Sequence, residues 1–145
     1  MKQKVLVLCT GNTARTQMAE GLFRELGADR ADVVSAGLEA TFVHPMAIQV
    51  MAERGIDISA HRSKSYTEFA DSIFDYVITV CDKAAGVCPT FPGPARRLHW
   101  DLPDPVLATG AEPERLKVFR EVRDAIELHI KGWLSERPLD DAAQP

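Results

Sequence analysis

A cysteine and an arginine stand six positions apart near the start of the chain, in the segment Cys9-Thr10-Gly11-Asn12-Thr13-Ala14-Arg15. A strand-like apolar run precedes this segment and a helical pattern follows it. Such a loop can turn its backbone N–H groups toward one centre, where the helix N-terminus adds positive potential. Arg15 can then hold two oxyanion oxygens, and the same field favours the Cys9 thiolate. The spacing predicts an oxyanion-binding loop with Cys9 as nucleophile.

Two residues inside the loop suit this interpretation. Gly11 permits a close backbone approach, and Asn12 tolerates a left-handed conformation that most residues resist. The alternative is a buried cysteine at a strand end with an unrelated arginine nearby. A nucleotide-binding phosphate loop is disfavoured, because the chain has neither Gly-x4-Gly-Lys-[Ser/Thr] nor Gly-x-Gly-x-x-Gly at this place.

A candidate general acid follows the last predicted strand, in the segment His99-Trp100-Asp101-Leu102-Pro103-Asp104-Pro105. A carboxylic acid there could protonate a leaving oxygen while the thiolate attacks. Taken alone, Asp101 and Asp104 are each more often turn formers, because aspartate is common in proline-rich loops. His99 and His61 are predicted to be structural or surface residues.

The chain has three cysteines, Cys9, Cys81 and Cys88, an odd number that cannot all pair in a disulfide framework. Cys81 and Cys88 are seven positions apart, whereas close zinc ligands are usually separated by two to four residues and number four per site. The pair is therefore either a redox pair near a reactive thiol or two unrelated thiols.

Strand and helix patterns alternate along the chain. Buried strands are predicted over 5–9, 32–36 and 75–81, with a shorter one over 96–100. Amphipathic helices are predicted over 14–26, from Pro45 to Gly55 and over 114–134. The alternation predicts a single α/β domain over 1–134, with a four-stranded, doubly wound parallel sheet and helices on both faces, followed by a flexible tail over 135–145. Cys9 and Cys81 fall at carboxyl ends of strands, where such sheets bind ligands.

Composition narrows the class of protein. The 145 residues are 46% apolar, which is typical of one globular domain. The net charge of −4 gives no indication that the protein binds nucleic acid or anionic membranes. The longest apolar runs are far shorter than the roughly twenty residues of a membrane-spanning helix. The N-terminus lacks a signal-peptide pattern. These features predict a cytoplasmic protein.

Taken together, these motifs resemble the thioredoxin-coupled arsenate reductases, which share the fold of the low-molecular-weight protein tyrosine phosphatases. The resemblance runs from Val5 to about Trp133. Besides the cysteines, Arg15 and Asp104-Pro105, it includes Gln17-Met18-Ala19-Glu20-Gly21, Ser35-Ala36-Gly37, Gly55-Ile56-Asp57-Ile58-Ser59 and His99-Trp100.

The resemblance implies a mechanism. Cys9 attacks arsenate held by the loop and Arg15, and Asp104 protonates the departing hydroxide. Cys81 then attacks Cys9 and releases arsenite, and Cys88 attacks Cys81. External thioredoxin reduces the resulting Cys81–Cys88 disulfide, so no bound cofactor is expected. Phosphate and sulfate are expected to compete with arsenate, and the protein is expected to be a monomer.

Three positions depart from relatives. Ala14 stands where phosphatases often have a second cysteine, and Thr16 stands where serine is usual but keeps the hydroxyl that can support the thiolate. Some family members bind potassium through residues matching Asn12, Glu20 and Ser35 plus a later aspartate. Here that later stretch reads Arg62-Ser63-Lys64, so a lysine ammonium is expected in the cation's position and no metal site is predicted.

The competing function is hydrolysis of phosphotyrosine or another phosphate ester by the same Cys9, Arg15 and Asp104. A thiol relay through Cys81 and Cys88 is of no use to hydrolysis, and Val106-Leu107-Ala108 replaces the tyrosines that usually grip an aryl substrate after the Asp-Pro pair. Phosphatase activity is therefore expected to be a weak side reaction. A phosphoprotein-binding module is disfavoured because Cys9 and Arg15 are both intact.

Overall fold

The computed structural model describes residues 2–81, 84, 86 and 89–136. Strands and helices alternate through most of the chain, as the sequence predicts. The elements are β1 (Gln3–Cys9), α1 (Arg15–Gly27), β2 (Ala31–Gly37), α2 (Pro45–Ala52), the 3-10 helix η1 (Tyr66–Phe69), β3 (Tyr76–Thr79), β4 (Arg96–His99), the 3-10 helix η2 (Pro105–Leu107) and α4 (Glu112–Ser135).

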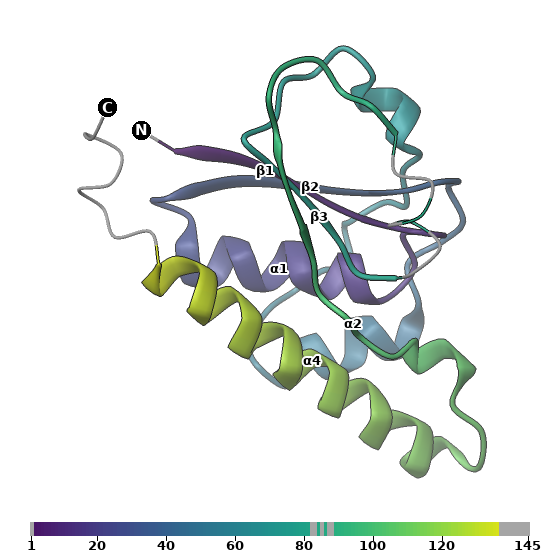
Figure 1. Cartoon of the computed structure of the whole chain (residues 1–145). Helices are drawn as coiled ribbons and strands as arrows, with labels where there is room; N and C mark the ends of the chain where they lie inside the picture. The colour runs from purple at the N-terminus through teal and green to yellow at the C-terminus, as the bar shows by residue number, and fades with distance from the viewer. Residues whose placement is uncertain (1, 82–83, 85, 87–88, 137–145) are drawn as a thin grey trace.

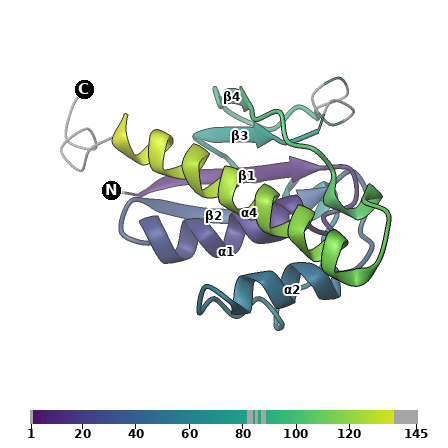
Figure 2. The same cartoon turned by 90° about the horizontal axis from the view of Figure 1, so that it is seen from below.

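The four strands form one parallel sheet in the order β2-β1-β3-β4 (Figures 1 and 2). β1 lies between β2 and β3, and its Leu8 pairs with Ala36 on one side and Thr79 on the other. Because β1 is covered on both faces and both edges, Val5 to Leu8 are fully buried. The predicted four-stranded parallel α/β fold is confirmed, and the carboxyl ends of β1 and β3 meet at one edge of the sheet.

The two faces of the sheet have different covers. Val5 and Val7 point into the larger core, which is shared with α1, α2 and α4. Leu6 and Leu8 point into a smaller core with Phe74 and Phe91, against which η1 packs. Figure 1 shows the three α-helices below the sheet and η1 above it. Figure 2 shows α1 running along the strands, α4 passing obliquely over them and α2 beside α1.

Aromatic packing joins α1, α4 and the end of the sheet. Phe23 of α1 stacks on Trp100 with ring centroids 6.0 Å apart and meets the edge of Trp133 of α4 at 5.5 Å. The outer surface of α4 is charged, with an ion pair of 2.8 Å between Lys131 and Glu127. None of the helices in the described part of the chain is long and apolar enough to span a membrane.

Charged side chains also tie the end of α2 to α4. Arg120 donates to both carboxylate oxygens of Glu53 at 2.8–3.1 Å, and Arg123 donates to Glu53 at 3.0 Å and to the Val50 carbonyl at 2.8 Å. The hydrogen bond from Arg120 lowers the pKa of Glu53 to about 2. Since the folded-state pKa lies below the ordinary value, this carboxylate stabilises the fold above pH 4.5 and loses its effect as the pH falls toward 2.

Glu53→Gln is therefore expected to lower the free energy of unfolding by up to about 1 kcal/mol at pH 7, the range for partly exposed ion pairs. The deficit should shrink as the pH falls from 4.5 toward 2. Urea unfolding at pH 7 and pH 3 measures this, with Glu121→Gln, which changes an exposed glutamate of α4, as the matched control. A deficit that is equal at both pH values would contradict the assignment.

Candidate active site

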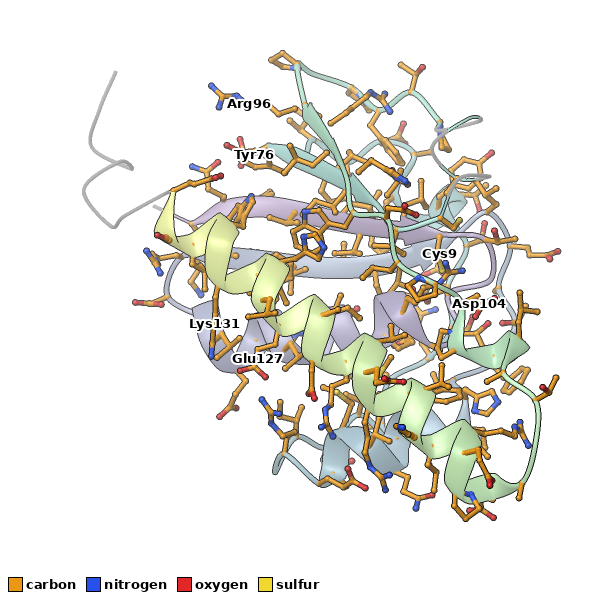
Figure 3. All side chains as sticks on the ribbon, turned by 60° about the horizontal axis from the view of Figure 1, so that its bottom comes forward. Cys9, Tyr76, Arg96, Asp104, Glu127 and Lys131 are labelled. Atoms are coloured by element: carbon orange, nitrogen blue, oxygen red, sulfur yellow. The ribbon has the colours of Figure 1, made fainter. Side chains whose placement is uncertain are left out.

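The predicted oxyanion loop lies at the carboxyl end of β1. Cys9 is the last residue of the strand and is 3% exposed, and Arg15 is the first residue of α1. The first turn of a helix has N–H groups without partners inside the helix, and these attract an anion. Figure 3 shows Cys9 and Asp104 at the end of the molecule opposite to Tyr76 and Arg96. The structure thus brings the predicted nucleophile, arginine and acid to one edge of the sheet.

Two groups contact the Cys9 thiol inside the loop. The Asn12 N–H donates to Cys9 Sγ at 3.2 Å, and Thr16 Oγ1 lies 3.2 Å from the same sulfur. Because Asn12 Nδ2 already donates to Thr16 Oγ1 at 2.8 Å, the hydroxyl proton of Thr16 is available to the sulfur. Asn12 has φ +52°, which is in the left-handed region, and asparagine tolerates this conformation better than most residues do. Both groups are placed to donate a hydrogen bond to the sulfur.

The Arg15 guanidinium is already held at the edge of the site. Its Nη1 donates to the carbonyls of Val80 at 3.2 Å and Leu102 at 3.0 Å, and its Nη2 lies 3.6 Å from Asp104 Oδ2. Val80 directly follows β3 and Leu102 lies in the loop after β4, so main-chain groups fix the orientation of the side chain. One edge of the fork is used for positioning, and the remaining N–H groups can hold an oxyanion.

Asp104 and Asp101, the two candidate acids, have different surroundings. Asp104 is the N-cap of η2, where its Oδ1 accepts the Val106 N–H at 3.0 Å. Its other oxygen, Oδ2, therefore faces Arg15. Asp101 is exposed. The geometry favours Asp104 as the carboxyl group that can reach a leaving oxygen bound at the loop.

A second thiol lies beside the loop. Cys81 is partly buried, and its Sγ lies 3.3 Å from Thr10 Oγ1 and accepts the Ala84 N–H at 3.4 Å. Thr10 follows Cys9 directly, so this contact places Cys81 next to the nucleophile's segment. Cys88, the third predicted relay residue, lies outside the described residues.

A buried polar network supports the loop from behind. Asn12 Oδ1 accepts from Gln17 Nε2 and from the Lys64 N–H, both at 2.8 Å, while Asn12 Nδ2 donates to Ser35 Oγ at 3.0 Å as well as to Thr16. All four hydrogen bonds that an asparagine side chain can make are formed. A network without unpaired groups holds one geometry, so the left-handed turn at Asn12 is fixed.

The network ends at a buried carboxylate. Glu20 accepts from the Ser35 hydroxyl at 2.7 Å and from the Ser35 N–H at 2.9 Å, and Lys64 Nζ lies 3.6 Å from it. The lysine ammonium therefore lies beside the buried Glu20 carboxylate that Ser35 also contacts. Across the part of the chain that the structure describes, no group of three or more His, Cys, Asp and Glu side chains is arranged to hold a metal.

His61, which is predicted from the sequence to be a structural or surface residue, belongs to the same network. Its Nδ1 lies 3.0 Å from Gln17 Oε1, an acceptor only, so Nδ1 carries the proton. Burial lowers the pKa of His61 more than the Glu20 carboxylate raises it. Sequence reasoning gave Gln17 no role of its own. A glutamine beside Met18 in a predicted helix gives no signal of these contacts.

Gly37 packs directly against the loop. A Cβ at this position would lie 2.7 Å from the Asn12 nitrogen, 2.8 Å from the Gly11 carbonyl carbon and 2.5 Å from the Glu39 oxygen. All three are backbone atoms, so the loop itself must shift to make room. Small displacements of a reacting group can cost on the order of 100-fold in rate.

Gly37→Ala is therefore expected to lower kcat/KM for an oxyanion substrate by about 100-fold, as steady-state kinetics would measure. Gly132→Ala is the matched control, because a Cβ there meets nothing within 4 Å. Equal activity of the two variants would show that the loop tolerates displacement.

Comparison with known proteins agrees with the geometry. The family model of the low molecular weight phosphotyrosine protein phosphatases matches residues 4–143. The chain therefore belongs to this family.

Within the family the chain is similar to arsenate reductases. An arsenate reductase of Halalkalibacterium halodurans is 45% identical over 132 residues, which are 91% of this chain and 95% of the relative. A solved arsenate reductase in the phosphate binding state is 35% identical with a TM-score of 0.74, covering 94% of this chain and 98% of that one. A thioredoxin-dependent arsenate reductase of Corynebacterium glutamicum is 29% identical with a TM-score of 0.70, covering 93% of this chain and 61% of that one.

Proposed function

We propose that this protein reduces arsenate to arsenite through a relay of three thiols that thioredoxin regenerates. The observation that carries the proposal is the second thiol at the oxyanion loop, where Thr10 contacts Cys81 directly after the nucleophile Cys9. Hydrolysis of a phosphate ester needs one cysteine, an arginine and an acid. A reduction needs a further thiol within reach of the first, and Cys81 fits that need.

In the first step, the Cys9 thiolate attacks the arsenic atom of arsenate. The loop N–H groups and the open edge of Arg15 hold the oxyanion, and Asp104 gives a proton to the departing oxygen. The products are a covalent Cys9–arsenic(V) adduct and water. Thr16 and the Asn12 N–H, both 3.2 Å from the sulfur, hold the nucleophile in place before the attack.

In the second step, the Cys81 thiolate attacks Cys9 Sγ. The sulfur–sulfur bond forms while the sulfur–arsenic bond breaks, and its electron pair stays on arsenic, which leaves as arsenite in the +3 state. Cys88 then attacks Cys81 Sγ, so that Cys9 returns as a thiolate and the disulfide joins Cys81 and Cys88. Two electrons from the thioredoxin dithiol reduce that disulfide.

Phosphatase activity is proposed as a weak side reaction. Cys9, Arg15 and Asp104 are together sufficient to form and hydrolyse a phosphoenzyme. The residues after Asp104 offer little to an aryl ester, because Val106 and Leu107 replace the tyrosines that grip such substrates in phosphatases, and Leu107 is 76% exposed.

The Lys64 ammonium is proposed to supply the positive charge that potassium gives some relatives. It is buried beside Glu20 and also donates to the Arg62 carbonyl at 3.1 Å. We therefore propose that the enzyme works without a bound metal or cofactor. We further propose that it acts as a monomer in the cytoplasm, where thioredoxin is reduced, because every catalytic group of the scheme comes from one chain.

Cys88→Ser tests the relay. The variant should release about one arsenite per chain and then stop, because Cys9 and Cys81 suffice for one round. Mass spectrometry should find the Cys9–Cys81 cross-linked peptide in the stopped variant and the Cys81–Cys88 peptide in wild type treated with arsenate alone. Sustained thioredoxin-dependent turnover at the wild-type rate would contradict a relay through Cys88.

A further inference from the structure

The carbonyl oxygen of Gly11, in the middle of the oxyanion loop, accepts two hydroxyl groups from distant segments. Thr41 Oγ1 donates to it at 2.7 Å and Ser63 Oγ donates at 3.1 Å. Thr41 lies between β2 and α2, and Ser63 lies between α2 and η1. Neither residue has a part in the mechanism above.

The protons of these hydroxyls can be assigned, because each hydroxyl has only one. The proton of Thr41 goes to the Gly11 carbonyl, so Thr13 Oγ1, 2.7 Å from Thr41 Oγ1, must donate to Thr41. Ser63 Oγ gives its proton to Gly11 and accepts the Thr41 N–H at 2.7 Å. Two hydroxyls therefore donate to the single Gly11 carbonyl oxygen: that of Thr41, which accepts from Thr13, and that of Ser63, which accepts the Thr41 N–H.

That carbonyl controls the neighbouring N–H. In a trans peptide the C=O of one residue and the N–H of the next point in opposite directions. With the Gly11 carbonyl held on the outer side, the Asn12 N–H is directed at Cys9 Sγ, 3.2 Å away. A rotated peptide would instead turn a carbonyl oxygen toward the thiolate and toward any bound oxyanion. Gly11 has no Cβ to resist such a rotation.

We propose that Thr41 and Ser63 are positioning residues for the oxyanion loop, acting through the Gly11–Asn12 peptide. The proposal rests on the proposed chemistry of Cys9 and deepens it. Packing of Gly37 against the Gly11 carbonyl carbon and the Asn12 nitrogen limits translation of the same peptide, and the two hydroxyls fix its rotation. The loops that follow β2 and α2 are thereby coupled to anion binding.

The test uses the full-length protein with Thr41→Val, Ser63→Ala and the double variant. Calorimetric titration with inorganic phosphate should show about tenfold weaker binding in the double variant, since one hydrogen bond to a charged group is worth about this much. Alkylation of Cys9 by iodoacetamide at pH 7, followed on the Cys9 peptide by mass spectrometry, should slow in the same variants. Thr41→Ser, which keeps the hydroxyl, should restore both values to within about twofold of wild type.

Thr67→Val is the matched control, because it removes an exposed threonine hydroxyl that bonds to Ser65 and not to the loop. The single variants decide the matter if the double variant melts at a lower temperature than the control. Phosphate binding and Cys9 alkylation at wild-type levels in Thr41→Val and Ser63→Ala would overturn the proposal, as would failure of Thr41→Ser to restore them. Neither readout involves arsenate reduction, so a wild-type protein that fails to reduce arsenate would refute the proposed function separately.

Discussion

Replacement of Cys9 by serine should abolish arsenate reduction and any hydrolysis of an aryl phosphate together. Both reactions begin with attack by the same sulfur, and a serine hydroxyl is a much weaker nucleophile than a cysteine thiolate. The expected loss is on the order of 10⁴-fold or more in kcat for either substrate. Initial rates with arsenate and with a small aryl phosphate measure it.

The control for this variant is binding of inorganic phosphate. The loop N–H groups and Arg15 are unchanged in Cys9→Ser, and removal of the thiolate removes a negative charge, so the affinity should be retained or increased. Measurable turnover of either substrate by the purified variant would place the nucleophile elsewhere. Loss of phosphate binding would show that the substitution had damaged the loop.

Replacement of Cys81 by serine should separate the two reactions. Hydrolysis of an aryl phosphate should stay within about twofold of wild type, because Cys9, Arg15 and Asp104 are intact and the serine can keep the contact with Thr10 Oγ1 that Cys81 makes at 3.3 Å. Arsenite release should fall below one molecule per chain, since a hydroxyl cannot take the place of the thiolate in forming a disulfide.

To measure arsenite release, the variant is incubated with arsenate but without thioredoxin, the reaction is quenched, and the arsenite formed per chain is determined. The control is Ser65→Ala, which removes a hydroxyl that caps η1 and makes no contact with Cys9 or Cys81 among the hydrogen bonds described above. Equal loss of both activities in Cys81→Ser would mean that the residue is needed for the fold of the site. Arsenite release at the wild-type level would remove Cys81 from the relay.

The positions of the main catalytic side chains can be predicted from the strand and helix patterns of the sequence. The unbroken apolar run before Cys9 predicts a central parallel strand, and the helical period after Ala14 predicts where the loop must end. The carboxyl ends of parallel strands lie at one edge of the sheet. The sequence therefore predicts that Cys9, Arg15 and Cys81 lie at the same edge, and the structure has them there.

Other parts of the site depend on tertiary contacts that no local pattern encodes. Arg15 is oriented by two main-chain carbonyls, at Val80 and Leu102, and a carbonyl has no sequence signature. Thr41 and Ser63 are ordinary loop residues until the fold carries them to the Gly11 carbonyl. The sequence also does not predict that one face of the sheet packs against the long α-helices and the other against a short 3-10 helix. An apolar strand has the same sequence pattern in both surroundings.

Arsenate-dependent oxidation of NADPH in the presence of thioredoxin and thioredoxin reductase tests the central claim most directly. The thiol relay transfers two electrons for each arsenite, so one NADPH should be consumed per arsenite formed, and consumption should stop when thioredoxin, arsenate or Cys9 is removed. The contrary result is rapid hydrolysis of an aryl phosphate with no arsenate-dependent NADPH consumption. That outcome would make this chain a phosphatase and leave Cys81 without a redox role.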